Sequence, residues 1–181
     1  EHPYAVSHKS GEDEVLLESK NIDTIIMRLS NAFGPPCDIN SNCWGLLVND
    51  LCCQAVMKNS LILRSSGLQR RDFITIDDVC RATDHLISIG SHKLGNGLFN
   101  VGGMWAPTIF EMSECISDRF FGLTGKRLEV KRNLEDDHLT LPLNFNIQKL
   151  LNTGFKLHKN IEGELDDLIK FCIEKKPCRS N

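Results

Sequence analysis

Two segments near the amino end of the chain decide its fold: PYAVSHKSGE at residues 3–12 and IIMRLSNAFGPP at residues 25–36. Between them, the apolar residues 15–17 are flanked by acidic side chains and fit an amphipathic helix. Asn21 and Asp23 interrupt that pattern. The sequence therefore predicts a helix that begins in the first segment and stops before the second.

The second segment opens with a short apolar run that is typical of a buried strand. Residues 24–29 are almost continuously apolar and rich in β-branched side chains, as in strands that a parallel sheet buries on both faces. A Gly-Pro-Pro sequence at 34–36 ends the strand, so residues 30–34 follow its carboxyl end. In open α/β sheets ligands bind at that edge, and we expect a binding site there.

The first segment carries a tyrosine and a histidine one helical turn apart. Tyr4 and His8 share a helix face, whereas Lys9 is rotated away from Tyr4. A phenol has an ordinary pKa of about 10, so it is a poor base at neutral pH unless a cation or the charge of a cofactor stabilises the phenolate. The spacing indicates an activated tyrosine, and the alternative is a half-buried aromatic residue that opens a helix.

Together, the two segments resemble the second half of the extended short-chain dehydrogenases/reductases, which act on nucleotide sugars. The matching pattern is Pro-Tyr-Ala-Val-Ser-x-x-x-Gly-Glu, a helix, a buried strand and Arg-x-x-Asn-x-x-Gly-Pro. The resemblance implies that Tyr4 is the catalytic acid/base. It also implies that the residue four positions later, a lysine in the family, holds the nicotinamide ribose and lowers the pKa of the tyrosine.

The chain departs from the family pattern at this second position. His8 stands where the family has lysine, and Lys9 is displaced by one residue. A neutral imidazole supplies no full positive charge above its ordinary pKa of about 6.5. Two interpretations stay open: Tyr4 and His8 both catalyse and contact the cofactor, or position 8 has drifted in a weakened site.

A third segment, GLQRRDFITIDDV at residues 67–79, resembles the family pattern Gly-x-x-x-Arg-Asp-Phe followed by an aspartate. The resemblance implies that Arg71 grips the diphosphate of the substrate. A guanidinium suits this task because its planar fork donates two parallel hydrogen bonds to phosphate oxygens. The alternative is a surface arginine paired with Asp72 or Asp77. We expect Asp77 to cap the helix that follows, and Asp72 and Asp78 to be structural.

Three further side chains are candidates for substrate binding. Asn31 lies at the end of the predicted strand, where its amide can hydrogen-bond the phosphate or the sugar; the alternative is a turn residue with a left-handed backbone. Trp44 and Asn49 follow and could line the sugar-nucleotide pocket, although Trp44 suits a core equally well. Arg28, inside the predicted strand, is expected to pair with a carboxylate. The acidic run at 135–137 stands where relatives often carry a phosphate-binding arginine, and we expect it to be solvated.

The composition excludes several classes of protein. The chain has 181 residues, of which 41% are hydrophobic and 25% charged, which excludes a membrane or a disordered protein. Its 21 basic and 24 acidic residues form no long block of one sign, so nothing points to nucleic acid or to an anionic membrane surface. No apolar run approaches the roughly 20 residues of a membrane span. We therefore expect a cytoplasmic protein.

Cysteines are frequent but do not form a metal-binding pattern. The eight cysteines are Cys37, Cys43, Cys52, Cys53, Cys80, Cys115, Cys172 and Cys178. No two have the Cys-x-x-Cys spacing, so we expect no metal site. Cys37 and Cys43 could pair, but two free thiols are favoured.

No glycine-rich phosphate-binding turn occurs anywhere in the sequence. Neither Gly-x-Gly-x-x-Gly nor Gly-x-x-Gly-x-x-Gly is present, so the pyrophosphate of a dinucleotide has no helix N-terminus to sit on. The resemblance implies NAD or NADP as cofactor, with its binding site largely in an N-terminal half that would precede residue 1. We expect a C-terminal fragment that binds dinucleotide weakly and is inactive alone.

The predicted fold class is α/β: the C-terminal part of a Rossmann-like parallel sheet plus a small mixed α/β substrate-binding domain. Residues 1–36 would belong to the dinucleotide-binding domain and residues 37–181 mainly to the substrate-binding domain, with 67–103 partly returning to the first. Further helices are expected over residues 44–57, 79–89, 107–123, 146–151 and 161–173, and further strands over 61–63, 98–101 and 128–130.

The resemblance implies an NAD(P)-dependent nucleotide-sugar epimerase, dehydratase or reductase. The alternative is a catalytically weakened or inactive protein of the same fold that binds nucleotide sugars or serves as a scaffold. A nucleoside-diphosphate sugar is the expected ligand, and a homo-oligomer or pairing with an N-terminal half the expected assembly. Each interpretation requires that Tyr4 and Arg71 converge on one cleft.

Overall fold

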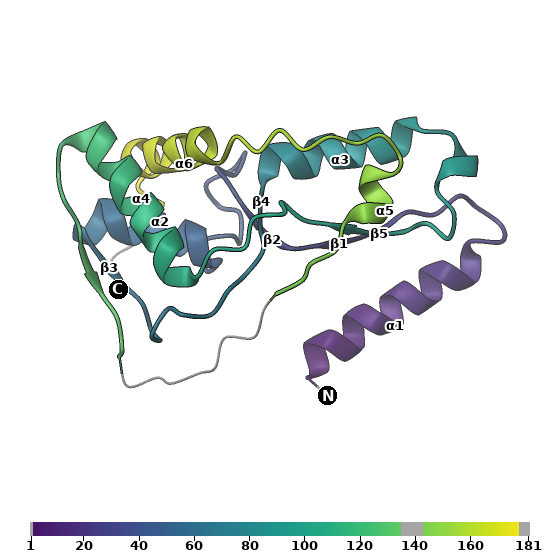
Figure 1. Ribbon diagram of the computed structural model, residues 1–181, viewed down its shortest axis with the longest axis horizontal. Coiled ribbons are helices and arrows are strands. Elements are labelled where there is room, and N and C mark those ends of the chain that lie inside the picture. Colours follow the sequence, from purple (N-terminus) through teal and green to yellow (C-terminus); the bar gives the residue numbers. More distant parts are fainter. Residues whose placement is uncertain (1, 135–142, 178–181) are drawn as a thin grey trace.

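The computed structural model describes residues 2–134 and 143–177, which form two groups of elements side by side (Figure 1). In chain order the elements are α1 (Pro3–Glu18), β1 (Ile26–Leu29), β2 (Asn31–Phe33), α2 (Leu47–Lys58), β3 (Ser60–Ile62), β4 (Phe73–Thr75), α3 (Ile76–Ser88), the 3₁₀-helix η1 (Ser91–Lys93), β5 (Leu98–Val101), α4 (Ile109–Thr124), β6 (Glu129–Lys131), α5 (Gln148–Leu151) and α6 (Ile161–Lys175).

All strand pairs among the described residues are parallel, which confirms the predicted α/β class. The strand β1 pairs with β5, β2 with β4, and β3 with β6. Only Ser30 separates β1 from β2, yet the two strands have different partners. The chain therefore passes from one strand pair into the next at the carboxyl end of β1, where the sequence predicted a site.

Two hydrophobic cores meet at β4. The helices α2, α4 and α6 pack around the first, which also contains Phe33 and Phe73. The second lies between β5, α3 and α5 and includes Ile74 and Phe99. Successive residues of a strand point to opposite faces, so β4 contributes Phe73 to one core and Ile74 to the other. The domain boundaries proposed from the sequence stay a prediction.

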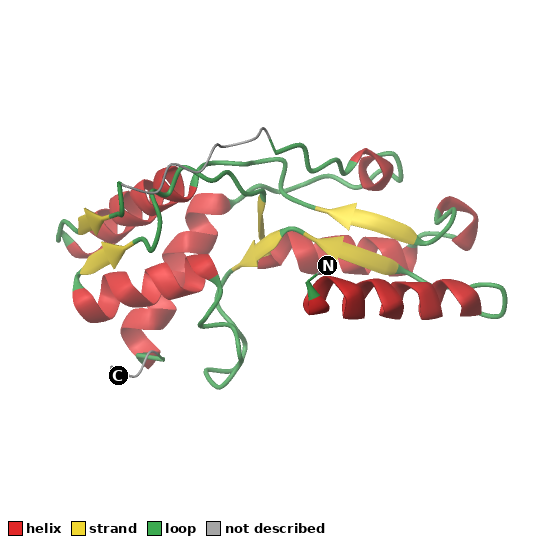
Figure 2. Cartoon of the chain, turned by 90° about the horizontal axis from the view of Figure 1, so that it is seen from below, coloured by secondary structure: helices red, strands yellow, loops and turns green. Residues whose placement is uncertain are grey.

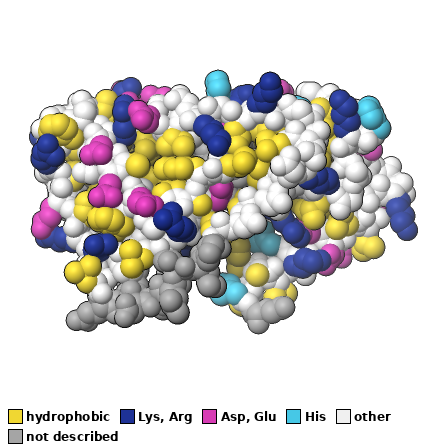
Figure 3. Space-filling view, in the orientation of Figure 1, with side chains coloured by type: hydrophobic (Ala, Val, Ile, Leu, Met, Phe, Trp, Pro, Cys, Tyr) yellow, Lys and Arg dark blue, Asp and Glu magenta, His cyan; other side chains and the backbone are white. Residues whose placement is uncertain are grey.

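The first helix forms over the expected residues, but it lies on the outside of the molecule and the apolar residues 15–17 do not pack into a core. None of the α1 side chains is buried, and the helix runs alongside β1 (Figure 2). The predicted carboxylate partner of Arg28 is Glu12: the arginine guanidinium donates to both carboxylate oxygens, at 2.7 and 2.5 Å. Hydrophobic side chains and histidines reach the surface around the amino end of this helix (Figure 3).

The prediction that the first strand is buried on both faces is wrong. Arg28 is exposed and Leu29 is 46% exposed, because among the described residues β1 pairs with β5 alone and α1 buries none of its side chains. Among the described residues, no helix is both long and apolar enough to cross a membrane.

Two predicted helix starts also need correction. The helix predicted from residue 44 begins at Leu47. The helix expected after Asp77 begins at Ile76, because the hydroxyl of Thr75 caps it by accepting the Asp78 N–H at 3.1 Å. Asp77 is therefore a first-turn residue and not the cap. The other predicted elements agree with the structure to within about three residues at each end.

Candidate functional site

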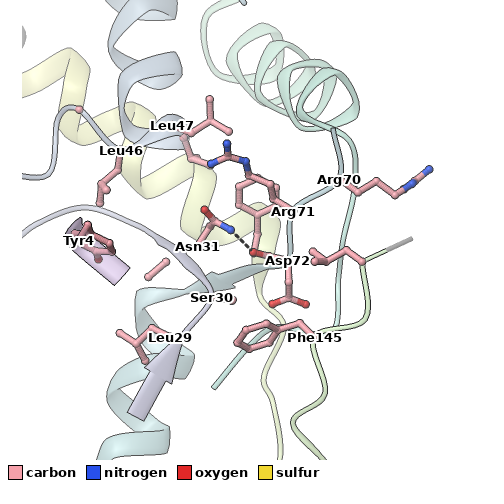
Figure 4. A pocket seen from close by; sticks show the side chains of 15 residues that line it. Tyr4, Leu29, Ser30, Asn31, Leu46, Leu47, Arg70, Arg71, Asp72 and Phe145 are labelled. Atoms are coloured by element: carbon pink, nitrogen blue, oxygen red, sulfur yellow. Dashed lines mark hydrogen bonds between the residues drawn. The ribbon is translucent and has the colours of Figure 1, made fainter. Parts of the chain in front are cut away.

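A cavity of about 700 Å³ lies at the carboxyl end of β1, between the two groups of elements. Several separate segments of the chain contribute to its wall. The lining residues are Tyr4, Leu29, Ser30, Asn31, Ala32, Gly45, Leu46, Leu47, Val48, Arg70, Arg71, Asp72, Phe73, Leu143 and Phe145. This cavity brings Tyr4, Asn31 and Arg71 together, three of the candidates from the sequence (Figure 4).

The phenol enters the cavity from the amino end of α1. The helix starts here because His2 caps it, with its Nδ1 accepting the Tyr4 N–H at 3.3 Å, and because Pro3 occupies the first turn. Tyr4 is 67% exposed, so its hydroxyl is open to a ligand. The ring of His8 packs on that of Tyr4, with 4.2 Å between centroids. His8 itself faces a shallower hollow beside α1 and does not line the main cavity.

Asn31 is the first residue of β2 and is held from the neighbouring strand pair. Its side-chain amide donates to the carbonyl oxygen of Asp72 at 2.9 Å, and its backbone N–H donates to the same oxygen at 3.1 Å. Extended strand geometry, and not a left-handed turn, therefore places this residue. In Figure 4, Asn31 lies between Tyr4 and Arg71.

The two neighbouring arginines before β4 have different surroundings. Arg70 donates to the carbonyl oxygen of Ala106 at 2.9 Å and to the Glu111 carboxylate at 3.3 Å, and its side chain extends away from the other lining residues (Figure 4). Arg71 lines the cavity, and its guanidinium has no ion pair or hydrogen bond with any residue that the structure describes. An exposed guanidinium without a partner is available to an anion.

The aspartates that could have neutralised Arg71 are occupied elsewhere. The carboxylate of Asp72 accepts the backbone N–H groups of Gly103 at 2.8 Å and Trp105 at 3.2 Å, so it fixes the turn after β5. Asp77 pairs with His158, whose Nδ1 lies 3.2 Å from its carboxylate. Asp78, the other residue expected to be structural, accepts two backbone N–H groups from residues 158 and 159.

Trp44 and Asn49 do not line the cavity. The Trp44 indole donates to the carbonyl oxygen of Ile39 at 2.8 Å, and its ring stacks on Phe171. Asn49 is only 2% exposed and donates to the carbonyl oxygen of Gly34 at 3.2 Å. Their chain neighbours Gly45 to Val48 form the wall instead. The helix α2 begins at Leu47, and its first turn directs Asn49 into the core.

Some lining residues were not identified from the sequence. Ser30 has a buried hydroxyl without a hydrogen-bond partner among the described residues, and only its place beyond the predicted strand could have marked it. Phe145 reaches the cavity from a distant segment, which no local pattern reveals. The acidic run at 135–137 lies outside the described residues. Cys37 and Cys43 are both free thiols, as expected.

An ion pair between α1 and β1 lies beside the site. The hydrogen bonds from Arg28 hold the pKa of the Glu12 carboxyl below its ordinary value, and Glu12 in turn raises the pKa of Arg28. This pair links α1 to β1 one turn beyond His8. It leaves Tyr4 at the free end of the helix, next to the cavity.

Comparison with solved structures identifies the fold. The chain matches a UDP-N-acetylglucosamine 4-epimerase from Methanobrevibacter ruminantium in complex with UDP-N-acetylmuramic acid, with a TM-score of 0.71 and 24% identity over 96% of this chain and 54% of that one. It matches RMD from Pseudomonas aeruginosa complexed with NADPH with a TM-score of 0.78 and 20% identity, over 97% and 57%. A UDP-glucose 4-epimerase from Thermotoga maritima with UDP-glucose gives 0.72 and 18%, over 96% and 54%.

These likenesses establish a fold shared with Rossmann-like enzymes, and the chain spans little more than half the length of each of the three. A search of curated proteins finds no match. The model of the NAD dependent epimerase/dehydratase family matches residues 1–102, which is more than half of the 181 residues. The chain therefore belongs to the NAD-dependent epimerase/dehydratase family.

Proposed function

We propose that the full-length protein is an NAD(P)-dependent nucleotide-sugar epimerase, dehydratase or reductase of the cytoplasm. The observation that carries this proposal is the shared cavity, in which the exposed phenol of Tyr4 and the guanidinium of Arg71, unpaired among the described residues, meet. A ligand that fits both groups has an anionic part and a hydroxyl that exchanges a proton. A sugar joined to a nucleoside diphosphate has both.

In this proposal Arg71 and Asn31 hold the diphosphate. The guanidinium offers paired donors to phosphate oxygens, and the neighbouring carboxylates do not compete because backbone N–H groups and His158 bind them. Asn31 has one amide hydrogen and its amide oxygen left after its bond to Asp72. The buried hydroxyl of Ser30, next to Asn31 in the chain, offers a further donor.

Tyr4 is the proton-transfer residue in this proposal. Its hydroxyl takes a proton from a sugar hydroxyl, or returns one, while the cofactor accepts or supplies the hydride. His8 packs against the phenol ring from the position that holds the family's lysine. The sequence has no glycine-rich turn, so of this chain only Tyr4 and His8 are assigned to the nicotinamide side of the cofactor.

Turnover of a panel of nucleotide sugars, followed through the reduced cofactor and through product analysis, tests this proposal in the full-length protein. Tyr4→Phe should lower kcat by about 10²- to 10⁴-fold, the usual loss of a general acid or base, and leave sugar-nucleotide binding intact. Arg71→Ala should instead weaken binding by at least about tenfold, because it removes a charge-assisted contact. Unchanged kinetics in both variants would refute the proposal.

A second candidate is a protein of the same fold that binds nucleotide sugars without turning them over. The replacement of the family's lysine by His8 favours it, since no permanent cation then lies one turn from the phenol. A panel in which neither the natural protein nor His8→Lys shows turnover, while Arg71→Ala still weakens binding, would support this candidate over the enzyme.

A further inference from the structure

A second cavity adjoins the first on the far side of Arg71. It measures about 400 Å³ and shares three lining residues with the first, namely Gly45, Leu47 and Arg71. Tyr4 lines only the first cavity, and Asp50 and Arg64 line only the second. The Arg71 guanidinium therefore marks the junction of two adjoining spaces that differ in their polar groups.

The position of Arg71 assigns the two ends of the ligand, and this assignment rests on the proposed function. With the diphosphate at the junction, the sugar must extend toward Tyr4, because the reacting hydroxyl has to reach the phenol. The nucleoside, on the other side of the diphosphate, then occupies the second cavity. The chemistry of that cavity consequently selects the base.

A fixed carboxylate is the distinctive polar group of the second cavity. Asp50 lies in the first turn of α2, where the helix dipole favours a negative charge. One of its oxygens accepts the Gln54 side-chain amide at 2.7 Å, and the Gln54 oxygen accepts the Ile62 N–H of β3 at 2.8 Å. No cation pairs with Asp50 in the part of the chain that the structure describes. Its second oxygen is therefore free, and the oxygen bonded to Gln54 keeps another lone pair, so both oxygens of this held side chain can accept hydrogen bonds.

We propose that Asp50 makes this cavity selective for guanine. The Watson–Crick edge of guanine carries two adjacent N–H donors, which a carboxylate binds with charge-assisted hydrogen bonds. Uracil and thymine place carbonyl oxygens on both sides of their single N–H, so a carboxylate there meets repulsion as well as one bond. Adenine and cytosine each offer an amino group next to a ring acceptor, which also opposes a carboxylate.

Guanine selectivity in this chain does not follow from the similar solved structures. Two of them are bound to UDP sugars, but at 24% and 18% identity they establish the fold alone. Asp50 is a residue of this chain whose surroundings point to a donor-rich base. Arg64, which lines the same cavity without an ion pair to the described residues, offers a guanidinium to the oxygen and nitrogen acceptors of guanine.

Calorimetric titration of the full-length protein with guanosine diphosphate and with uridine diphosphate tests the assignment. We expect guanosine diphosphate to bind at least about tenfold more tightly, in line with the discrimination that a bidentate base contact provides. Asp50→Asn should abolish that ratio or reverse it, because an amide offers donors and an acceptor together and so complements uracil. Asp84→Asn, at an exposed position of α3, makes the same charge change away from both cavities and should keep the ratio.

Equal or tighter binding of uridine diphosphate by the natural protein would overturn the proposal without touching the proposed function. The base assignment also fails if Asp50→Asn, with a normal melting curve, keeps the preference for guanosine diphosphate. Should Asp50→Asn not fold, the ratio measured on the natural protein still decides. If neither diphosphate binds and Arg71→Ala changes nothing, both the base assignment and the proposed function fail.

Discussion

At the residue scale, the decisive feature of the site is the different fate of two adjacent arginines. Arg70 is neutralised by Glu111, whereas Arg71, one residue later, faces the cavity without a partner among the described residues. Alternating side-chain direction in an extended segment accounts for the difference, since neighbours point to opposite sides. The isolated bridge between Arg70 and Thr108 fixes that segment against the start of α4. One guanidinium thus anchors the loop, and the other is left for a ligand.

The packing of His8 on Tyr4 predicts that a permanent positive charge at position 8 would raise turnover. A cation one helical turn from the phenol favours the phenolate, the form that accepts a proton from the sugar hydroxyl. A lysine keeps its charge to well above about pH 9, so His8→Lys should hold the activity and exceed the natural protein by about tenfold at about pH 8.5. A pH–rate profile of both proteins measures this.

Lys9→Ala is the matched control for that profile, because Lys9 pairs with Asp13 on the exposed side of α1. It should leave the pH profile unchanged. Equal kcat/KM values for His8→Lys and the natural protein at about pH 8.5 would contradict a role for charge at position 8.

The sequence predicted those candidate-site residues whose types are unusual for their position. It did not predict the lining residues that only tertiary packing brings to the cavity. Tyr4, Asn31 and Arg71 follow from a local motif, and the cavity contains all three. Trp44 was ambiguous because an aromatic side chain suits a pocket and a core equally, and packing on Phe171 decided it. Phe145 was beyond reach, since only the tertiary fold brings it to the cavity.

At the element scale, Glu164 of α6 places its carboxyl group against Gly34, the residue that follows β2. The Oε1 atom of Glu164 lies in the space that a β-carbon on Gly34 would need, and the φ of 151° at Gly34 also favours glycine there. Burial, together with the nearby carboxylates of Asp77 and Asp167, raises the pKa of Glu164 to about 7. Above neutral pH the half-buried Glu164 carboxylate therefore carries a negative charge close to those of Asp77 and Asp167.

This contact predicts that the protein loses stability as pH rises from about 4.5 to about 7. The folded state binds the Glu164 proton more tightly than the unfolded state, so the free energy of unfolding falls across that window. Glu164→Gln removes the charge and should gain about 1–2 kcal/mol at about pH 8, a value discounted for partial solvent exposure, and nothing near pH 4.5. Urea unfolding at both pH values measures it.

Glu174→Gln, near the exposed end of the same helix, is the control and should change stability at neither pH. An equal gain from Glu164→Gln in the acidic and the alkaline measurement would show that the charge is not the cause.

Element types were predictable where the pattern is strong, and boundaries were not. Thr108 and Glu111 form a capping box that starts α4 within two residues of the expected position. The start of α3 was misassigned because three candidate caps, Thr75, Asp77 and Asp78, stand close together, and only the end of β4 selects among them. The exposure of β1 depended on which elements cover it, information that a local sequence does not hold.

At the scale of the whole molecule, the surface around α1 and β1 is unusually apolar. Large hydrophobic side chains on these elements and the turn between them are exposed, among them Val6, Val15, Leu17, Ile22 and Leu29. Contiguous exposed apolar surface favours association, and the outer edge of β1 has no partner strand among the described residues.

The 181-residue chain alone should therefore self-associate. Sedimentation velocity should give a weight-average mass that rises with concentration, and Leu17→Glu should lower it because the leucine is 68% exposed on α1. Ile87→Glu puts the same charge on an equally exposed site of α3 and should have less effect. A monomer at every concentration would contradict this expectation.

The short strand β4 joins the two hydrophobic cores of the molecule. Phe73 packs in one core and Ile74 in the other. Unfolding of either core therefore exposes one face of β4, the strand that follows Arg71. The Arg71 guanidinium, which we propose binds the diphosphate, thus lies next to the strand that both cores share. A ligand held there stabilises the two together, so occupancy and cooperative unfolding are coupled through a single short strand.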